Sequence, residues 1–295
     1  MKIILKLITI GFLFSLLLNS CSDDESTEVS TTKELILNLS GLADLGADFV
    51  YEGWIIVNGM PVSTGTFSSI NFPQSFTVNI AKLDSATKFV LSIEPTNDND
   101  PAPSATKILV GDFLGNSATV EASIVGDFSN SSGKYILATP TDGSDTNENS
   151  GIWFLDPTSG TPVAGLNLPT LPAGWIYEGW TVINGKPVST GTFDKVSATD
   201  NAATFSGAMT LPMPNGADGF FPGEDFLMAA PSGLTFPTDI AGGKAVISIE
   251  PVPDNSLMPF SMKPLVGDIP VDAMDHTLYM LNQNLGSLPS GSVSR

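Results

Sequence analysis

The sequence is poor in the side chains that carry most protein chemistry. Its 295 residues include one cysteine, Cys21, and one histidine, His276. This excludes intramolecular disulfides, thiolate zinc sites and metal centres built on a histidine pair. We expect His276 to be exposed or packed on a strand, because no partner for general-base chemistry is evident. The motifs GxSxG and HExxH and a phosphate-binding glycine loop are also missing. We therefore predict no catalytic residue, no cofactor and no metal site, and we expect that the protein is not an enzyme.

Basic residues are scarce as well. The sequence has 12 lysines and arginines against 31 aspartates and glutamates, which gives a formal net charge of −19. Such a surface repels phosphate backbones, so we predict no nucleic-acid binding. The acidity is explained by the solubility of an exported protein, and the alternative is a calcium-rich or cationic partner. Charged residues make up only 15% of the chain and apolar residues 42%, which indicates a globular protein. Twenty-eight glycines and 22 prolines fall between short apolar runs, as is typical of an all-β protein.

The one long apolar run lies at the N-terminus. Residues 1–20 carry two lysines and then an apolar stretch, which predicts a signal peptide. The end of this stretch, Leu-Leu-Asn-Ser-Cys at 17–21, resembles the lipobox of bacterial lipoproteins. The resemblance implies that Cys21 becomes the first mature residue and carries lipid, palmitate included, that anchors the chain to a membrane. The acidic run Ser-Asp-Asp-Glu at 22–25 resembles the surface-export signal of outer-membrane lipoproteins, which implies outward display. Residues 21–33 are predicted to be the lipidated end and a flexible tether.

Two blocks of sequence occur twice. The first reads YEGWIIVNGMPVSTGTF and YEGWTVINGKPVSTGTF, identical at thirteen of seventeen positions, over Tyr51–Phe67 and Tyr177–Phe193. The second contains KFVLSIEP and KAVISIEP, each followed by LVGD, and begins at Lys88 and Lys244. The duplication predicts two tandem modules. We place them at 34–127 and 133–285, with a joint at 128–132 and a tail at 286–295.

The repeated blocks have the pattern of strands and hairpins. Alternation puts Tyr51 and Ile55 on one face of a strand and Glu52 and Trp54 on the other. The Asn-Gly pair that follows is a strong signal for a type I′ hairpin, and the proline after it places the returning strand at a sheet edge or delays its start. All four tryptophans lie in strand-like runs and are expected in the core. We predict an all-β fold of two β-sandwich modules, and we assign the strands within 134–156 to the second.

The second module is longer than the first. The offset between the copies is 126 residues at Tyr51 and 156 at Lys88, so thirty additional residues lie within 194–243. Long loops on rigid sheets often carry specificity. One segment of this insertion is therefore a candidate ligand or partner loop. Its residues are Phe220, Phe221, Glu224, Asp225 and Phe226. The alternative interpretation is that the phenylalanines cover an open end of the sandwich.

Carboxylates recur at equivalent positions of the two modules. The pairs Glu52/Glu94 and Glu178/Glu250 have the residue types of a glycosidase site, but structural hydrogen bonding explains them at least as well. Glu52 and Glu178 share a strand face with a tryptophan, so each should be paired or hydrogen-bonded, and Lys88 and Lys244 are the available cations. Two acidic loops, Asn97–Asp100 and Thr141–Gly151, contain oxygens suitable for calcium without the spacing of a calcium-binding loop, and we interpret them as polar turns.

The order of these blocks resembles the C-terminal, extracytoplasmic domain of anti-sigma-K factors. The resemblance lies in YEGW…NG.PVSTGTF and V(L/I)SIEP…K.LVGD, and it covers most of 35–124 and 166–281. It implies a β-sandwich outside the cytoplasm and no catalytic residue. The chain has no sigma-binding segment, so we expect no direct binding to a sigma factor. The sequence thus predicts a non-enzymatic, outer-membrane lipoprotein that binds an unknown envelope partner or acts as a scaffold. The alternatives are a surface glycan-binding or adhesion protein and, third, an enzyme such as a glycoside hydrolase.

Overall fold

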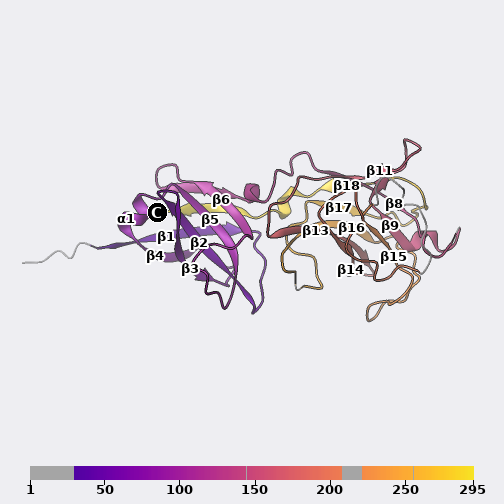
Figure 1. Ribbon diagram of the computed structural model, residues 1–295, viewed down its shortest axis with the longest axis horizontal. Helices are drawn as coiled ribbons and strands as arrows, with labels where there is room; N and C mark the ends of the chain where they lie inside the picture. The colour runs from indigo at the N-terminus through magenta and orange to yellow at the C-terminus, as the bar shows by residue number, and fades with distance from the viewer. Residues whose placement is uncertain (1–29, 144, 208–220, 255) are drawn as a thin grey trace, which may run out of the picture. The chain divides into compact units, whose positions relative to one another are not determined.

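Two large antiparallel sheets contain nearly all the regular structure of the described residues, which confirms the all-β prediction (Figure 1). The computed structural model describes residues 30–143, 145–207, 221–254 and 256–295. The first sheet has the order β3-β2-β5-β6-β7-β19-β1-β4. Its strands are β1 (Thr32–Ser40), β2 (Phe49–Val57), β3 (Met60–Phe67), β4 (Gln74–Asn79), β5 (Lys88–Pro95), β6 (Lys107–Asp112), β7 (Ser117–Glu121) and β19 (Ser290–Ser294).

The second sheet repeats this arrangement in the order β14-β13-β16-β17-β18-β8-β9-β15, with β12 pairing with β8 beside this path. Two strands of the 134–156 region, β8 and β9, pair within this second sheet. Its strands are β8 (Ser132–Leu137), β9 (Gly151–Trp153), β12 (Leu166–Asn167), β13 (Trp175–Ile183), β14 (Lys186–Phe193), β15 (Gly223–Asp225), β16 (Lys244–Pro251), β17 (Leu265–Asp268) and β18 (Tyr279–Gln283). A separate pair is formed by β10 (Leu155–Asp156) and β11 (Val163–Ala164).

Among the residues that the structure describes, helices are short. The α-helix α1 (Ile80–Asp84) follows β4, and its N-terminus is capped by Asn79, whose side chain accepts a hydrogen bond from the amide of Lys82. Three single turns of 3₁₀ helix lie at Ala122–Ile124, Glu148–Ser150 and Leu285–Ser287. Within the described part of the chain, none of these helices has the length and apolar character needed to cross a membrane.

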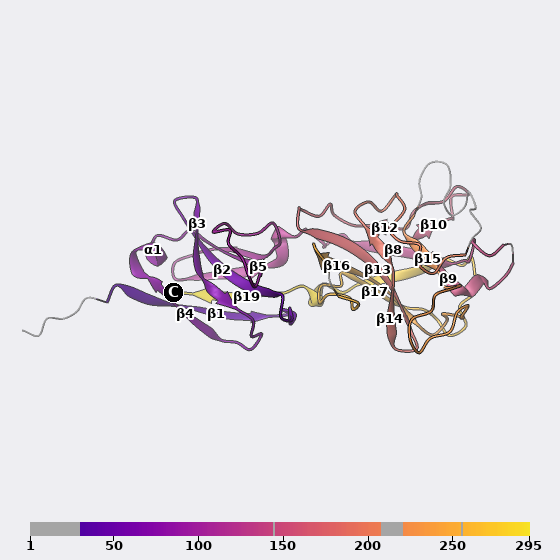
Figure 2. The same cartoon turned by 60° about the horizontal axis from the view of Figure 1, so that its bottom comes forward.

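The chain passes from the first sheet to the second after β7 and returns to the first sheet after β18. Strand β7 of the first sheet continues into β8, which pairs with β18 in the second sheet. Strand β18 in turn continues into β19, which pairs with β7 and β1 in the first sheet. Figure 2 shows the yellow strand β19 among the indigo and purple strands of the first sheet. The exchanged strands begin with the same dipeptide, Ser132-Gly133 and Ser290-Gly291.

This exchange corrects the predicted module boundaries. The residues 286–295 were expected to be a tail, but Ser290–Ser294 forms an interior strand of the first sheet, with Val293 fully buried. The segment 34–127 therefore does not complete its own sheet. The terminal Arg295 secures the strand, since its guanidinium donates to backbone carbonyls of Ala86 and Gly115 at 2.8 and 3.1 Å.

The repeated YEGW block forms the hairpin that the sequence predicts in both sheets. Asn58 and Gly59 have φ values of 51° and 79°, and Asn184 and Gly185 repeat them at 52° and 78°, as a type I′ turn requires. The returning strands β3 and β14 both lie at a sheet edge, which is where the proline in each is tolerated. Both strands contain a register shift opposite the YEGW glycine, at Gly53/Trp54 and Gly179/Trp180.

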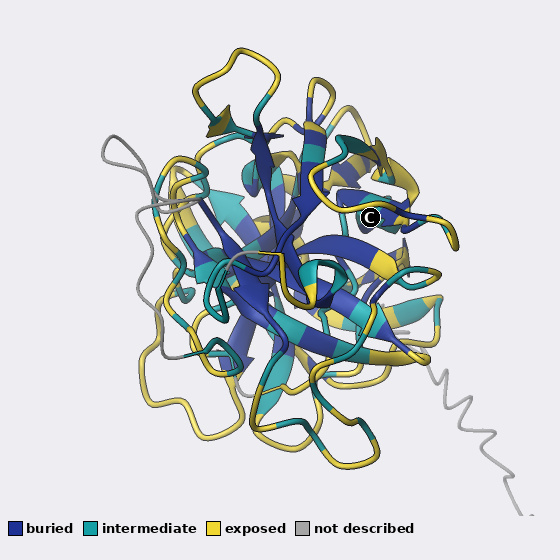
Figure 3. Ribbon diagram, turned by 90° about the vertical axis from the view of Figure 1, so that its right-hand side faces the viewer, coloured by how far each residue is buried: buried dark blue, intermediate teal, exposed yellow. Residues whose placement is uncertain are grey.

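The two faces of the central strands differ in their surroundings. Tyr51, Ile55 and Tyr177 belong to the main hydrophobic core, while Trp54 and Trp180 lie on the opposite face and are nonetheless buried. Figure 3 shows that buried residues follow the strands and that exposed residues follow the loops. All four tryptophans are buried, as predicted.

Candidate functional site

A chain of hydrogen bonds connects the buried tryptophan of the second sheet to a buried carboxylate. The indole Nε1 of Trp180 donates to Ser248 Oγ at 2.8 Å, and the Ser248 hydroxyl donates to Glu250 Oε1. The same carboxylate oxygen accepts the backbone amide of Phe260 at 2.9 Å. Trp180 lies on β13 and Ser248 and Glu250 on β16, whose backbones pair directly, so the sheet register sets this geometry.

The first sheet contains the same hydrogen-bond chain. Trp54 Nε1 donates to Ser92 Oγ at 2.8 Å, Ser92 donates to Glu94 Oε1, and the amide of Ser104 donates to the same oxygen at 2.9 Å. The loop that follows is also equivalent, since Lys107 donates to the carbonyl of Ser104 as its counterpart Lys263 does to that of Phe260. The SIEP sequence is thus repeated because it connects a strand, a buried tryptophan and a loop.

The glutamates of the YEGW blocks are hydrogen-bonded, as predicted, but not to the lysines that the sequence suggested. Glu52 accepts a hydrogen bond from Ser63 and Glu178 from Ser189, each from the neighbouring edge strand. The lysines pair instead with the aspartates that end the LVGD blocks: Lys88 with Asp112 at 3.1 Å, and Lys244 with Asp268. These lysines lie opposite the aspartates in the sheet register, which determines the pairing.

Three carboxylates come together beside the second sheet. Ligand atoms of Glu178, Glu250 and Asp254 lie within 4.8 Å of one another, and no other such group of three occurs among the described residues. Glu178 is 6% exposed and Glu250 is fully buried, while Asp254 is partly exposed. Asp254 lies in the loop after β16, where its Oδ1 accepts the amide of Ser256 at 2.9 Å.

Burial dominates the electrostatics of this cluster. It raises the pKa of Glu178 from 4.5 to about 8, and the charges of Glu250 and Asp254 add to the rise against the hydrogen bond from Ser189. Burial also raises the pKa of Glu250 to about 7, opposed by the hydrogen bonds from Ser248 and Phe260. Burial lowers the pKa of Lys263, which lies near Glu250. Charge on these glutamates is therefore costly unless a cation accompanies it.

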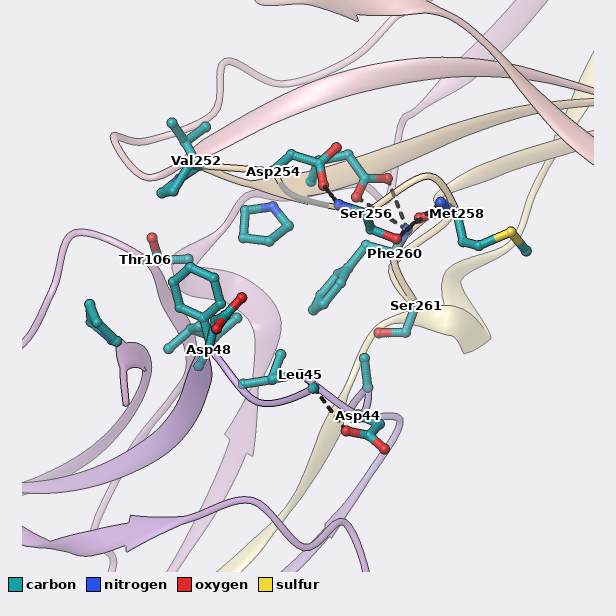
Figure 4. Close-up of a pocket in the computed structure, with 18 of the residues that line it drawn as sticks. Asp44, Leu45, Asp48, Thr106, Val252, Asp254, Ser256, Met258, Phe260 and Ser261 are labelled. Atoms are coloured by element: carbon teal, nitrogen blue, oxygen red, sulfur yellow. Dashed lines mark hydrogen bonds between the residues drawn. The ribbon is translucent and has the colours of Figure 1, made fainter. Parts of the chain in front are cut away.

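Glu250 and Asp254 also line a pocket of about 610 Å³ (Figure 4). The pocket is formed by loops that follow equivalent strands of the two sheets and by the segment before β2. The first half of the chain contributes 43–49, Ile93, Pro95 and 104–106, and the second half contributes 250–254, Ser256 and 258–261. Such a volume is in the range of small-molecule and short-peptide sites.

The pocket combines an apolar lining with negative charge. Its acidic side chains are Asp44, Asp48, Glu250 and Asp254, and none of its lining residues in the described parts of the chain is basic. Apolar and proline side chains make up much of the rest, including Leu45, Phe49, Ile93, Met258 and Phe260. An apolar pocket with carboxylates at its wall is complementary to a ligand that carries both an apolar group and a positive charge.

The segment that the sequence suggested as a contact loop is buried over its described residues, 221–226. Phe221, Glu224, Asp225 and Phe226 are all buried, and Phe220 lies outside the described residues. The two phenylalanines pack within hydrophobic clusters. These four side chains therefore form no exposed lip, and their burial agrees with the alternative that the phenylalanines cover part of the fold.

The two acids of this segment find donors from distant parts of the sequence. Asp225 accepts the indole of Trp153 at 3.0 Å and the amide and hydroxyl of Thr141 at 2.8 and 2.6 Å. Glu224 accepts the amide of Phe205 at 3.2 Å and the hydroxyl of Ser206. These hydrogen bonds hold the inserted residues onto the sheet.

The histidine and the acidic loops singled out in the sequence are not among the residues that line the pocket. His276 is exposed beside Asp275, with 3.3 Å between Nδ1 and Oδ1. In the first acidic loop, Asp98 accepts a hydrogen bond from the backbone amide of Asp100 at 2.8 Å. In the second, Asp142 accepts one from the side-chain amide of Asn147 at 2.7 Å, as is common in polar turns. Cys21 lies outside the described residues.

Comparisons of the chain with protein-family models, curated proteins and solved structures find no match. The site must therefore be interpreted from its own residues. Sequence reasoning paired Glu178 with Glu250 and missed Asp254. A signal was present, because Asp254 stands 156 residues after Asp98, the same offset that relates Glu250 to Glu94.

Proposed function

We propose that this chain is a non-enzymatic, lipid-anchored protein of the cell envelope that binds a partner through the acidic pocket. The partner presents a basic group flanked by apolar atoms, such as a lysine or arginine in an exposed peptide segment. The chain is anchored through Cys21 to the outer membrane and faces the exterior. The resemblance of its modules to the extracytoplasmic domain of anti-sigma-K factors supports a binding role outside the cytoplasm and does not extend to sigma-factor binding.

The observation that carries the proposal is the composition of the pocket wall. Asp44 and Asp48 come from the loop before β2, and Glu250 and Asp254 from the loop end of β16, so both halves of the chain supply charge of one sign. Asp44 Oδ1 accepts only the nearby amide of Gly46 among the hydrogen bonds that the structure describes, at 2.9 Å. A cationic group entering the pocket gains favourable interactions with these carboxylates in a partly desolvated setting.

The alternatives are less well supported by the geometry. A glycosidase needs two carboxyl groups that flank a sugar, and Glu178 and Glu250 are almost completely buried. A glycan-binding surface needs exposed aromatic rings, and every aromatic side chain in the described part of the chain is buried or partly buried. A partner protein with basic residues fits the pocket better than a sugar.

Titration with short peptides tests the pocket directly. We expect the purified protein to bind a tripeptide with lysine between apolar residues, measured by calorimetry, and not the same peptide with glutamate in place of lysine. The double variant Asp44→Asn/Asp48→Asn should weaken this binding. The matched control is Asp194→Asn/Asp272→Asn, which removes the same charge from exposed positions outside the pocket. Binding that is equal for both peptides, or equally reduced in both variants, contradicts the proposal.

The anchor requires a separate test, because its residues lie outside the described part of the chain. We expect the protein expressed in an outer-membrane-bearing bacterium to incorporate labelled palmitate and to sediment with outer membranes. The variant Cys21→Ser should lose the label and the sedimentation. External protease should digest the anchored protein in intact cells, and protection from it would contradict outward display.

A further inference from the structure

The carboxylate cluster of Glu178, Glu250 and Asp254 has the spacing of ligands around one divalent cation. Calcium binds oxygen at 2.3–2.6 Å, so two ligand oxygens on opposite sides of the ion are about 4.6–5.2 Å apart, and adjacent ones are closer. The ligand atoms of all three residues lie within 4.8 Å of one another. They lie on the paired strands β13 and β16 and in the loop that follows β16.

The burial of Glu178 supplies an independent reason to place a cation here. Its side chain is 6% exposed, Oε1 accepts the Ser189 hydroxyl, and Oε2 has no hydrogen-bond donor among the described residues. A buried carboxylate oxygen without a donor is costly. Its near neighbours Glu250 and Asp254 are further carboxylates, and their negative charges repel a charge on Glu178. A cation between them satisfies this oxygen and offsets the repulsion.

Lys263, the basic side chain near the cluster, does not neutralise the three carboxylates. Lys263 donates to the backbone carbonyls of Phe260 and Pro259 instead. It makes no ion pair with any of the three acids within 4.0 Å in the described structure. The cluster is thus three carboxylates with one indirect positive neighbour, and a divalent ion nearly neutralises it.

The first sheet shows what the same scaffold does without the cluster. Glu52, Glu94 and Asp98 are the counterparts of Glu178, Glu250 and Asp254. Glu94 is equally buried, but Asp98 is exposed and accepts an amide of its own loop, and the three form no close group. The loops differ in sequence between the shared residues, Thr96-Asn97 in the first and Val252-Pro253 in the second. The second loop alone brings its aspartate to the glutamates.

We propose that Glu178, Glu250 and Asp254 form a calcium-binding site at the wall of the pocket, in the second module only. Monodentate or bidentate carboxylates from these residues, completed by water from the pocket side, give the oxygen-rich coordination that calcium takes. The ion holds Asp254 to the strands that carry Glu178 and Glu250 and so fixes one wall of the pocket. The site shares two residues with the proposed partner site but does not depend on that function.

Calcium binding by the purified full chain in detergent tests the proposal. We expect calcium chloride to raise the melting temperature of the EDTA-treated protein and to give one binding event per chain by calorimetry. Glu178→Gln/Asp254→Asn should weaken calcium binding by about tenfold or more, since it removes two of three charged ligands. It should also melt at the same or a higher temperature in EDTA, because it removes repulsion, so loss of binding is separated from failure to fold.

The first module provides the matched control. Glu52→Gln/Asp98→Asn removes the same charges from the equivalent positions, and this variant should bind calcium as the unaltered protein does. The pocket variant Asp44→Asn/Asp48→Asn should also retain calcium binding, which distinguishes failure of the cation site from failure of the partner site. The absence of calcium binding at millimolar concentration overturns the proposal. So does a response that magnesium reproduces and that persists in the Glu178→Gln/Asp254→Asn variant, because it reports general screening of acidic charge.

Discussion

The indole nitrogen of Trp180 donates a 2.8 Å hydrogen bond to the hydroxyl of Ser248, and the two residues lie on adjacent strands of the second sheet. The Ser248 hydroxyl in turn donates a hydrogen bond to Glu250, so the serine connects a buried aromatic ring to a buried acid. Trp54 and Ser92 repeat the relationship at the same distance in the first sheet. The strongest sequence identity between the modules therefore preserves an internal polar network on the face opposite the core.

Replacing Ser248 by alanine tests how much this hydrogen-bond network stabilises the fold. The change leaves the buried Nε1–H of Trp180 without its acceptor and removes a donor from Glu250, so we expect a loss of about 1–3 kcal/mol in the free energy of unfolding. Urea denaturation followed by tryptophan fluorescence measures it. Ser75→Ala, at an exposed position of β4, is the control and should change stability by no more than about 0.5 kcal/mol. Equal effects of the two substitutions would refute the network's role.

Much of this fold was predictable because its signals are local. The Asn58-Gly59 turn, the alternation around Tyr51 and the edge position of β3 follow from residue chemistry within a few positions, and all appear in the structure. Because the block occurs twice, each prediction applied to both sheets. The type of fold and the turns of the central hairpins could therefore be predicted without a structure.

What was missed depends on contacts between distant segments. Strand β19 has the sequence SGSVS, and nothing in it distinguishes a strand of the first sheet from one that stays beside β18. The acids Glu224 and Asp225 resembled a contact loop because their donors, such as Ser206 and Thr141, lie 18 and 84 residues away. Asp254 joins the carboxylate cluster through the path of its loop, which residue spacing alone does not determine.

Removing residues 289–295 tests the strand exchange. If β19 fills the space between β7 and β1, its deletion exposes two strand edges and the buried contacts of Val293, and the first sheet loses stability. We expect amide hydrogen exchange to accelerate strongly in β1 and β7 and to change little in β13 and β16. Arg295→Ala should give a smaller effect in the same direction, since it removes the guanidinium contacts alone. Unchanged protection of β1 and β7 after the deletion would rule out the exchange.

The glycine of the repeated LVGD block is predicted to matter more in the first sheet than in the second. A Cβ on Gly111 would lie 2.0 Å from the carbonyl oxygen of Thr119, whereas one on Gly267 would lie 2.9 Å from that of Met280. Gly111→Ala therefore forces two backbones apart, and we expect a loss of about 1–3 kcal/mol, with a smaller loss for Gly267→Ala. Gly286→Ala is the control, because no atom lies within 4 Å of its added Cβ. Melting temperatures rank the three variants, and the reverse order of Gly111 and Gly267 would contradict the close approach.

The buried acids that hold the inserted segment predict how stability varies with pH. Burial raises the pKa of Glu224 from 4.5 to about 7, against hydrogen bonds from Ser206, Phe205 and Asp225, and raises the pKa of Asp225 from 3.8 to about 6. Between their unfolded and folded pKa values the folded protein holds more protons than the unfolded chain. By linkage, the stability that these groups confer is complete below about pH 4 and falls as the pH rises through about 7.

We therefore expect the melting temperature in EDTA to be higher at pH 5 than at pH 8. The variant Glu224→Gln should reduce this difference, because the amide remains neutral across the range and its oxygen can still accept the Ser206 hydroxyl. Glu121→Gln, an exposed change on β7, is the control and should leave the pH difference in place. A melting temperature that rises from pH 5 to pH 8 in the unaltered protein, or a pH difference that Glu224→Gln does not alter, would show that Glu224 is not held protonated by its burial.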